Sequence, residues 1–181
     1  MKYKQTLILK NGKTCIFRHA ETADAAEVLR SFLQTHGETD NLLTYPEESK
    51  MTVDGEADFL QKTTDSENAI ELCAVVDGKL VGTAGIEPIG AREKLRHRAE
   101  FGISIEKAYW GQGIGRALTA ACIEIAKAAG YAQLELQVVA DNAAAVALYK
   151  SLGFTEYGRN PLGFRSRTTG WQPLILMRLE L

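Results

Sequence analysis

The sequence predicts a single domain of the α/β (α+β) class over residues 1–181, in which a mixed central sheet carries helices on both faces. Three observations support this fold class. Two turn signals, Asn11-Gly12 and Asp77-Gly78, each lie between short apolar runs, as in β-hairpins. The second half of the chain alternates strand and helix patterns. A length of 181 residues, 45% of them apolar, is enough for one full core.

The first helix is predicted over residues 23–36, directly after the first hairpin at residues 3–20. Thr22 precedes this helix and is expected to be its N-cap. Apolar residues at helical spacing predict its buried face: Ala25, Val28, Leu29, Phe32 and Leu33. A polar loop broken at Pro46 leads to a second helix, which Thr52 is expected to cap.

The second hairpin is predicted at residues 69–88, and a charged loop follows it at residues 90–98. The next elements are a strand (99–105), a helix (113–130), a strand (133–139), a helix (142–152) and two strands (154–159 and 172–181). The longer helix is expected to bury a stripe of Ile114, Leu118, Ala121, Ile125 and Ala128. Asp141 or Asn142 is expected to cap the shorter helix, and Gly130 and Gly153 are expected to end the two helices.

Three glycines, Gly111, Gly113 and Gly115, stand at the start of the longer helix. Glycine destabilises a helix by roughly 1 kcal/mol relative to alanine, but it lets the backbone approach a ligand closely. The free N–H groups of a helix N-terminus favour phosphate. A P-loop would need Lys and then Ser or Thr where the chain has Arg116 and Ala117, and a dinucleotide fingerprint fails in both possible frames.

Two motifs resemble the GNAT superfamily of acetyl-CoA-dependent N-acetyltransferases, and the resemblance extends over nearly the whole chain. Residues 101–127 are similar to its central strand, pyrophosphate loop and helix, with the pattern Gln/Arg-x-x-Gly-x-Gly/Ala. Residues 141–154 are similar to its second hallmark, an Asn near the start of a helix and a Tyr seven residues later. Trp110 departs from the first pattern, whose first position is Gln or Arg.

The resemblance implies a GNAT fold whose sheet splays between the strands at 99–105 and 133–139. Acetyl-CoA would bind there as a cosubstrate, and no metal is implied. Free main-chain groups of the first strand would hold the pantetheine arm, and N–H groups of the glycine loop would hold the pyrophosphate. Asn142 would bond the pantetheine or only cap the next helix. The implied contacts are Ile103, Ser104, Ile105, Gly111, Gln112, Gly113, Ile114, Gly115, Arg116 and Asn142.

Tyr149 occupies the family's general-acid position, where a phenol would protonate the departing sulfur; the alternative is a tethered core tyrosine. Many relatives have a Glu where this chain has Gln137, and an amide does not titrate. Glu100 is therefore the preferred general base, directly or through water. Its alternatives are an ion pair with a nearby arginine and an anchor for the substrate amine. Glu135 lies on the same strand as Gln137 but farther from the Asn142 helix.

The acceptor is expected to be a primary amine of a small molecule or a peptide, attacking directly in a ternary complex. Glu38, Asp40, Glu47 and Glu48 are candidates for attracting it, unless they simply form a polar loop. Residues 163–171 are predicted to be a flap over the acceptor or a plain surface hairpin. Two rivals remain: a catalytically weak CoA-binding sensor or structural module, which Gln137 favours, and an NAD-dependent oxidoreductase.

Composition limits the partners. A net charge of -2 gives no reason to expect nucleic acid, and no apolar run is long enough to span a bilayer. The N-terminus lacks a signal-peptide pattern, so a cytoplasmic location is expected. Cys15, Cys73 and Cys122 are odd in number, lack metal spacing and are expected to be buried. Dimers are common in the family that the sequence resembles, so a homodimer is one possible state of this chain.

Overall fold

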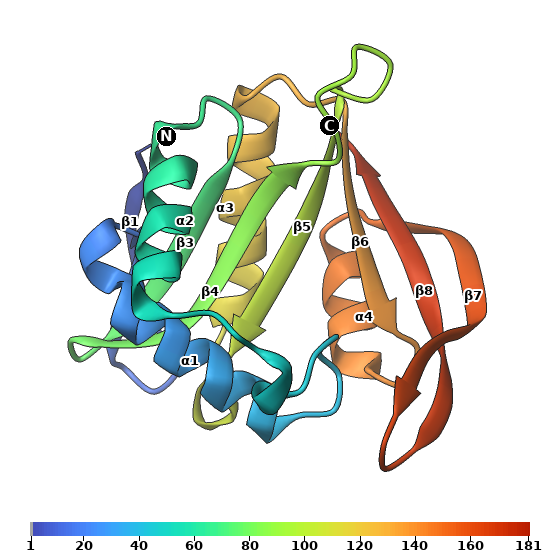
Figure 1. Ribbon diagram of the computed structural model, residues 1–181, viewed down its shortest axis with the longest axis horizontal. Coiled ribbons are helices and arrows are strands. Elements are labelled where there is room, and N and C mark those ends of the chain that lie inside the picture. The colour runs from blue at the N-terminus through green and yellow to red at the C-terminus, as the bar shows by residue number, and fades with distance from the viewer. Residues whose placement is uncertain (1) are drawn as a thin grey trace.

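The computed structural model describes residues 2–181 and places its strands in one mixed sheet (Figure 1). The strand order is β1-β2-β3-β4-β5-β6-β8-β7, and only β5 and β6 run parallel. The strands are β1 (Lys4–Ile8), β2 (Thr14–His19), β3 (Ile70–Val76), β4 (Lys79–Pro88), β5 (Arg98–Ile105), β6 (Gln133–Val139), β7 (Thr155–Ser166) and β8 (Gly170–Glu180). The helices are α1 (Ala25–Glu38), α2 (Val53–Asp65), α3 (Ile114–Ala128) and α4 (Ala143–Ser151).

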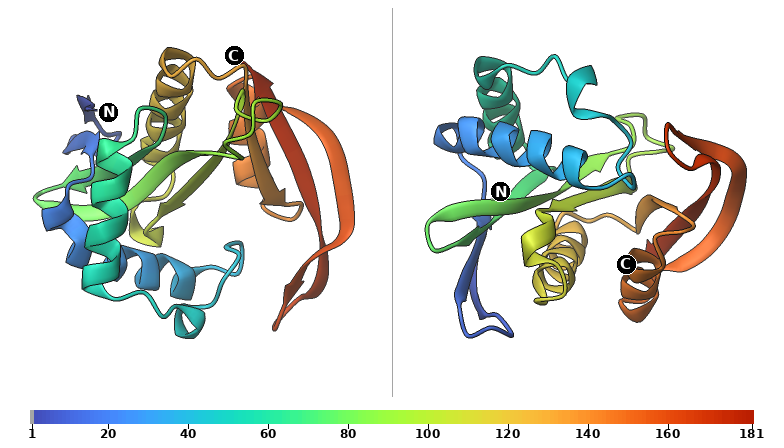
Figure 2. Two further views of the ribbon diagram at one scale, coloured as in Figure 1. Left: turned by 45° about the horizontal axis from the view of Figure 1, so that its top comes forward. Right: turned by 90° about the horizontal axis from the view of Figure 1, so that it is seen from below.

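Helices cover both faces of this sheet (Figure 2). α1 and α2 lie on one face, and α3 and α4 lie on the other. The larger core includes Phe101 of β5 and Leu118 of α3, whereas a smaller one includes Val28 of α1 and Leu60 of α2. The predicted fold class is therefore confirmed.

Both predicted hairpins form as their turn residues indicate. Gly12, between β1 and β2, has a φ of 82°. Asp77 and Gly78, between β3 and β4, have φ values of 50° and 80°. Two successive residues with positive φ give the tight turn that matches the twist of antiparallel strands.

The helix ends are also close to the prediction. The side chains of Thr52 and Asn142 each accept a hydrogen bond from the backbone N–H three residues later, at 3.1 and 3.2 Å. Gly130 and Gly153, just beyond α3 and α4, have φ values of 80° and 95°. Both caps and both glycine stops are confirmed, because each depends only on local sequence.

The predicted cap of α1 is wrong. A 3₁₀ turn at Thr22–Asp24 precedes the helix, and the Asp24 carboxylate accepts the Glu21 N–H at 2.8 Å. The Thr22 hydroxyl instead donates to the Gln61 side chain on α2 at 3.1 Å. A carboxylate two residues later therefore replaces Thr22 as the group that organises the first turn.

Two positions on the predicted helix faces also differ. Leu33 of α1 is 39% exposed, whereas Ser31 and Thr35 of the same helix are buried. α1 thus buries small side chains, while its longer apolar residues Leu29 and Phe32 are only half-buried. On α3, Ala128 is exposed because it lies in the last turn of the helix. The other four residues of the predicted α3 stripe are buried.

The sheet divides between β5 and β6. These strands pair only where Arg98–Glu100 faces Gln133–Glu135. β5 then continues along β4 to Ile105, while β6 continues along β8 to Val139. The resulting wedge is visible between the two strands in Figure 1. It lies where the resemblance placed the splay, so that part of the fold prediction is confirmed.

The edge of β5 that faces this wedge carries backbone groups with no strand partner. The Glu106 N–H donates to the Val81 carbonyl of β4 at 2.9 Å. The even-numbered residues of β5 therefore direct their backbone hydrogen bonds toward β4. Alternate residues of an antiparallel strand point their N–H and C=O groups to opposite sides. The backbone groups of Phe101, Ile103 and Ile105 therefore point into the wedge.

Other sequence expectations concern the whole chain. Cys15, Cys73 and Cys122 are free and buried, as predicted. Within residues 2–181, no helix combines the length and apolar character needed to cross a membrane. The same residues contain no cluster of three or more His, Cys, Asp or Glu side chains arranged to hold a metal ion.

Candidate active site

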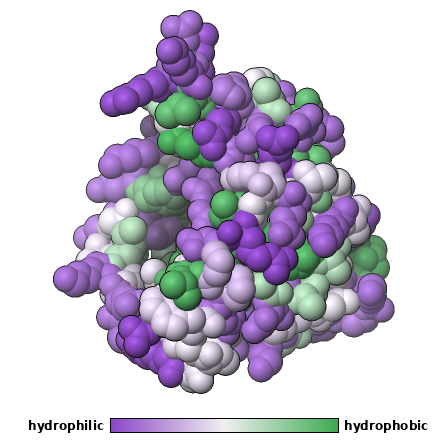
Figure 3. Space-filling model, turned by 90° about the vertical axis from the view of Figure 1, so that its right-hand side faces the viewer, coloured by the Kyte–Doolittle hydropathy of each residue, from purple (hydrophilic) through white to green (hydrophobic). Residues whose placement is uncertain are grey.

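A cavity of about 970 Å³ fills the wedge and continues over the face of the sheet that α1 and α2 cover. Figure 3 shows the surface hollowed on this side of the molecule, with hydrophobic and hydrophilic residues side by side. Most residues predicted for the site line this cavity: Glu100, Ile103, Ser104, Ile105, Gly111, Gly113, Gly115, Arg116, Asn142 and Tyr149. Gln112 and Ile114 are not among its walls, and the Ile114 side chain is buried in the core.

The glycine loop gives one end of the cavity the properties of an anion site. Gly111 and Gly113 have φ values of 73° and 98°, and a Cβ on either would meet nothing within 4 Å. The helical ladder of α3 starts with the Ala117 N–H, which donates to the Gly113 carbonyl at 3.1 Å. The N–H groups just before Ala117 therefore have no acceptor within the helix. Open space beside such donors fits a diphosphate.

A substitution pair tests this assignment. Gly113→Ala is expected to weaken acetyl-CoA binding about tenfold, or about 1.4 kcal/mol, because the new methyl group fills the open space. Gly130→Ala is the matched control, since Gly130 also has a positive φ and open surroundings, but at the other end of α3. Both variants should lose about 1 kcal/mol of stability through backbone strain. Calorimetric titration should show weakened binding for Gly113→Ala alone; equal affinities would refute the site.

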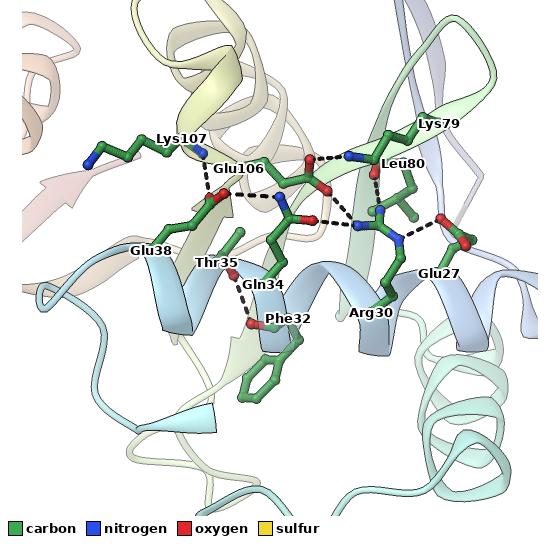
Figure 4. Close-up of polar contacts among 10 residues, drawn as sticks. All are labelled: Glu27, Arg30, Phe32, Gln34, Thr35, Glu38, Lys79, Leu80, Glu106 and Lys107. Atoms are coloured by element: carbon green, nitrogen blue, oxygen red, sulfur yellow. Dashed lines mark hydrogen bonds and ion pairs between the residues drawn. The ribbon is translucent and has the colours of Figure 1, made fainter. Parts of the chain in front are cut away.

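A buried glutamate fixes the backbone just before the glycine loop (Figure 4). Glu106, at the end of β5, is 0% exposed. Its carboxylate accepts hydrogen bonds from Arg30 of α1 at 2.7 Å and from Lys79 of β4 at 2.5 Å. The next backbone N–H, that of Lys107, donates to Glu38 of α1 at 2.6 Å. The loop is thus anchored to α1 and β4 before its first glycine.

Trp110, the departure from the family pattern, changes one predicted contact. Its indole N–H donates to the carbonyl of Ile105 at 2.7 Å. That carbonyl is therefore already engaged, and only the N–H of Ile105 still points freely into the wedge. Gln112 is also engaged, because its side chain donates to the Ala108 carbonyl at 3.1 Å and accepts from Asn11 at 2.7 Å. The β1–β2 turn thereby docks onto the glycine loop.

Tyr149 and Asn142 reach the cavity from α4. Tyr149 is 7% exposed, and its ring makes an edge contact with Phe101 at a centroid distance of 6.1 Å. Burial raises the pKa of Tyr149 to about 12. The Asn142 side chain accepts the Ala145 N–H, so it caps α4 as well as lining the cavity.

The sheet face beneath α1 and α2 contributes three carboxylates to the cavity wall: Glu71 of β3, Glu87 of β4 and Glu100 of β5. Glu87 pairs with Glu100 across β4 and β5, so their side chains share this face. Glu71 was missed by sequence reasoning, because its strand is separated from β5 by a hairpin and a charged loop. Burial raises the pKa of Glu71 to about 8.

The two β6 candidates have different surroundings. Gln137 lines the cavity, whereas Glu135 is buried and bound by the Arg98 guanidinium, with one contact at 2.7 Å. The bond to Arg98 holds the pKa of Glu135 below its usual value. Glu135 is therefore a structural ion-pair partner.

The acidic loop predicted to attract an amine instead joins two parts of the fold. Asp40 accepts hydrogen bonds from Ser166 and Thr168 at the tip of the β7–β8 hairpin. Tyr45 accepts the Arg167 N–H at 2.7 Å and lies under its guanidinium, 3.8 Å from ring centroid to carbon. Glu47 pairs with the same guanidinium. We call these contacts the clasp. They attach the predicted flap, residues 163–171 at the tip of this hairpin, to the connection between α1 and α2.

The clasp ties one wall of the cavity to the β7–β8 hairpin. Residues of the α1–α2 connection, Thr39 and Asn41 to Leu43, line the cavity wall. Asp40, between them, is bonded to the hairpin tip. Of the four acidic residues, Glu38 and Glu48 also have internal partners, the N–H groups of Lys107 and Tyr45. These internal partners favour the alternative that the sequence left open, a polar loop, over attraction of an amine.

Comparison with known proteins places this geometry in a family. A model of the acetyltransferase (GNAT) family matches residues 32–154, which is more than half of the chain. The chain belongs to the GNAT acetyltransferase family. The matched region includes the glycine loop and α4, the two segments whose sequences resemble GNAT motifs.

Relatives and solved structures agree with this assignment. An L-amino acid N-acetyltransferase of Escherichia coli is 31% identical over 77% of this GNAT chain and 82% of its own length. A [ribosomal protein bS18]-alanine N-acetyltransferase of Escherichia coli is 42% identical over 45% of this chain, which spans about half of that relative's length (54%). A GNAT-family acetyltransferase from Streptococcus pneumoniae is 32% identical, with a TM-score of 0.88 over 92% of this chain and 99% of that one.

Proposed function

We propose that this GNAT protein transfers an acetyl group from acetyl-CoA to a primary amine by direct attack in a ternary complex. One observation carries the proposal. A single cavity connects the glycine loop, the unpaired edge of β5, Tyr149 and the carboxylates of the sheet face. The proposed sites for a diphosphate, an extended thioester and an acceptor would thus share one continuous space.

The cosubstrate half of the site uses mainly backbone groups. The N–H groups at the start of α3 and the Arg116 side chain would hold the pyrophosphate, and the N–H groups of Ile103 and Ile105 would hold the pantetheine arm. Bound acetyl-CoA would supply an activated acetyl group. A backbone N–H aimed at the thioester oxygen would stabilise the negative charge that develops there, and one such donor is worth ~3 kcal/mol.

Tyr149 is proposed as the general acid. Since burial raises its pKa to about 12, the phenol keeps its proton at every physiological pH. The phenol therefore carries a proton that it can donate to the departing sulfur. Its position on α4, across the wedge from β5, is consistent with this role, because the thioester would lie between the two elements.

The acceptor is proposed to be a small molecule or the end of a peptide. The α1–α2 connection lines one wall of the cavity, and the clasp ties it to the hairpin, which favours a slender acceptor over a folded protein surface. Glu87 and Glu100 would attract its ammonium group. Two relatives are named for amino acids and for a protein alanine, so free amines of both kinds are reasonable first candidates.

A CoA-binding module with little catalysis is the second candidate. Gln137 supports it, because it lines the cavity but cannot accept a proton as a carboxylate would. This module would bind acetyl-CoA and release no thiol in the presence of any amine.

An acceptor panel separates these functions. Purified protein is mixed with acetyl-CoA and, in turn, spermidine, L-alanine, L-methionine, kanamycin and a hexapeptide with N-terminal alanine. New thiol is measured, with a protein-only blank for the three cysteines. Release with one class supports the enzyme and identifies its acceptor. A rise in melting temperature with acetyl-CoA, without any release, supports the binding module; a rise with NAD alone would refute both.

A further inference from the structure

We propose that Glu71, on β3, is the general base that accepts the proton of the acceptor amine. This inference rests on the acetyl transfer proposed above and identifies a group that its mechanism does not yet use. Glu71 lies on the cavity wall, two strands away from the wedge edge of β5.

Two glycines clear a path from Glu71 to β5. Glu71 pairs with Gly85 of β4, and Gly85 pairs with Gly102 of β5, so the three residues form one row across the sheet. A Cβ on Gly85 would overlap a Glu71 carboxylate oxygen, so the carboxylate lies directly above Gly85. A Cβ on Gly102 would meet nothing within 4 Å.

The open space above Gly102 is where an acceptor nitrogen would fit. Neighbouring strands are about 4.8 Å apart, so the carboxylate above Gly85 lies about one strand spacing from this space. That distance is too long for a direct hydrogen bond of ~2.6–3.2 Å, but one bridging water spans it. The backbone of Ile103, the next residue, points into the wedge where the thioester would lie. The row thus connects the base to the site of attack.

The groups around Glu71 are mostly anionic or neutral. Glu56 of α2, Glu87 of β4 and Glu100 of β5 are the carboxylates nearest this part of the face, and His36 of α1 lines the same cavity. Thr83 donates a hydrogen bond to Glu71, and no lysine or arginine within residues 2–181 forms an ion pair with it.

These surroundings suit the proton transfer. Solvent reaches Glu71 through the cavity, while protein atoms enclose it elsewhere, and burial is the largest cause of its pKa of about 8. A primary ammonium group has a pKa near ~10. Transfer to Glu71 is therefore less unfavourable than transfer to a carboxylate with an ordinary pKa near ~4.3.

The proton balance closes without another reactant. Glu71 takes one proton from the acceptor ammonium, and the neutral nitrogen then forms its bond to the acetyl carbon. The carbon–sulfur bond breaks with its electron pair on sulfur. Tyr149 gives its proton to the sulfur. The nitrogen then loses a second proton, which restores the Tyr149 hydroxyl. Glu71 finally releases its own proton to water. Glu100 remains the group that attracts the ammonium.

The test compares three glutamine variants, with the amine of the panel that gives the highest rate in wild type. Glu71→Gln, which keeps the Thr83 hydrogen bond, should lower kcat about 100-fold at pH 8. In wild type, kcat/KM should rise with pH and show an inflection near the Glu71 pKa of about 8. Glu71→Gln should abolish this inflection. Glu100→Gln should mainly raise KM and keep that inflection. Glu56→Gln, a buried glutamate of α2 outside the cavity wall, should stay within about twofold of wild type.

A second readout does not need activity. A folded carboxyl with a raised pKa holds its proton after the unfolded one has lost it, so wild-type stability should fall as pH rises from about 4.5 toward 8. Thermal unfolding of Glu71→Gln should lack most of this fall, and the variant should be the more stable form at pH 9.

The outcomes distinguish this inference from the proposed function. Wild-type turnover together with an unchanged pH profile in Glu71→Gln would overturn the role of Glu71 and leave acetyl transfer intact. Loss of the inflection in Glu100→Gln instead would make Glu100 the base. Acetyl-CoA binding without thiol release from any amine would overturn both. Partial recovery of rate in Glu71→Asp, which keeps the carboxylate at shorter reach, would support the assignment.

Discussion

Glu106→Ala should lower the free energy of unfolding by about 3 kcal/mol and weaken acetyl-CoA binding. Removing one member of a buried ion-pair network costs about 3–5 kcal/mol when the remaining charges stay buried. Here the remaining side chains, Arg30 and Lys79, are 33% and 43% exposed, so water can solvate them and the cost lies at the lower end. Urea unfolding gives the stability, and calorimetric titration gives the affinity for acetyl-CoA.

Glu27→Ala is the matched control for this variant. Glu27 also pairs with Arg30, at 2.9 Å, but its side chain is 53% exposed. An exposed ion pair contributes ~0–1 kcal/mol, so this variant should have nearly the stability of wild type and unchanged affinity. If Glu106→Ala were as stable as Glu27→Ala, the network would not anchor the glycine loop.

Tyr149→Phe should lower kcat about 100-fold and leave the affinity for acetyl-CoA unchanged. A positioned proton donor contributes typically 10²–10⁴-fold to a rate, and phenylalanine retains the ring contact with Phe101 while removing the donor. The kinetics are measured with the acceptor found in the amine panel, and binding is measured by calorimetry.

Tyr131→Phe is the control for this second variant. Tyr131 is also buried, and its hydroxyl donates to the Asn68 carbonyl at 2.8 Å, outside the cavity wall. Losing that bond should cost about 1 kcal/mol of stability and leave kcat within about twofold. Full turnover by Tyr149→Phe would show that its hydroxyl does not serve the departing sulfur.

Features set by neighbouring residues could be predicted from the sequence. The turns at Gly12 and Gly78, the cap at Asn142 and the glycines before α3 all depend on a few adjacent positions. The wedge was also predicted, because the motifs on both sides of it resemble those of a known family. These are the features that a single stretch of chain specifies by its own conformational preferences.

Features that depend on strand register and distant contacts were missed. Glu71 shares a row with Gly102 only because two antiparallel pairings align β3, β4 and β5. Glu106 meets Arg30 across 76 positions of sequence, and Asp40 meets Thr168 across 128. The neighbours of such an acidic residue in the sequence give no local sign of its partner, so its role becomes visible only in the folded chain.

The short pairing of β5 with β6 also bears on solubility. An unpaired strand edge on a protein surface is a template for association with other chains, and natural proteins protect such edges. Here the unpaired edge lies in the interior of the strand order, between β5 and β6, so a strand of another molecule would have to enter the wedge to pair with it. The free hydrogen-bonding groups of β5 can thus bind a narrow ligand, but they cannot easily pair with a strand of another molecule.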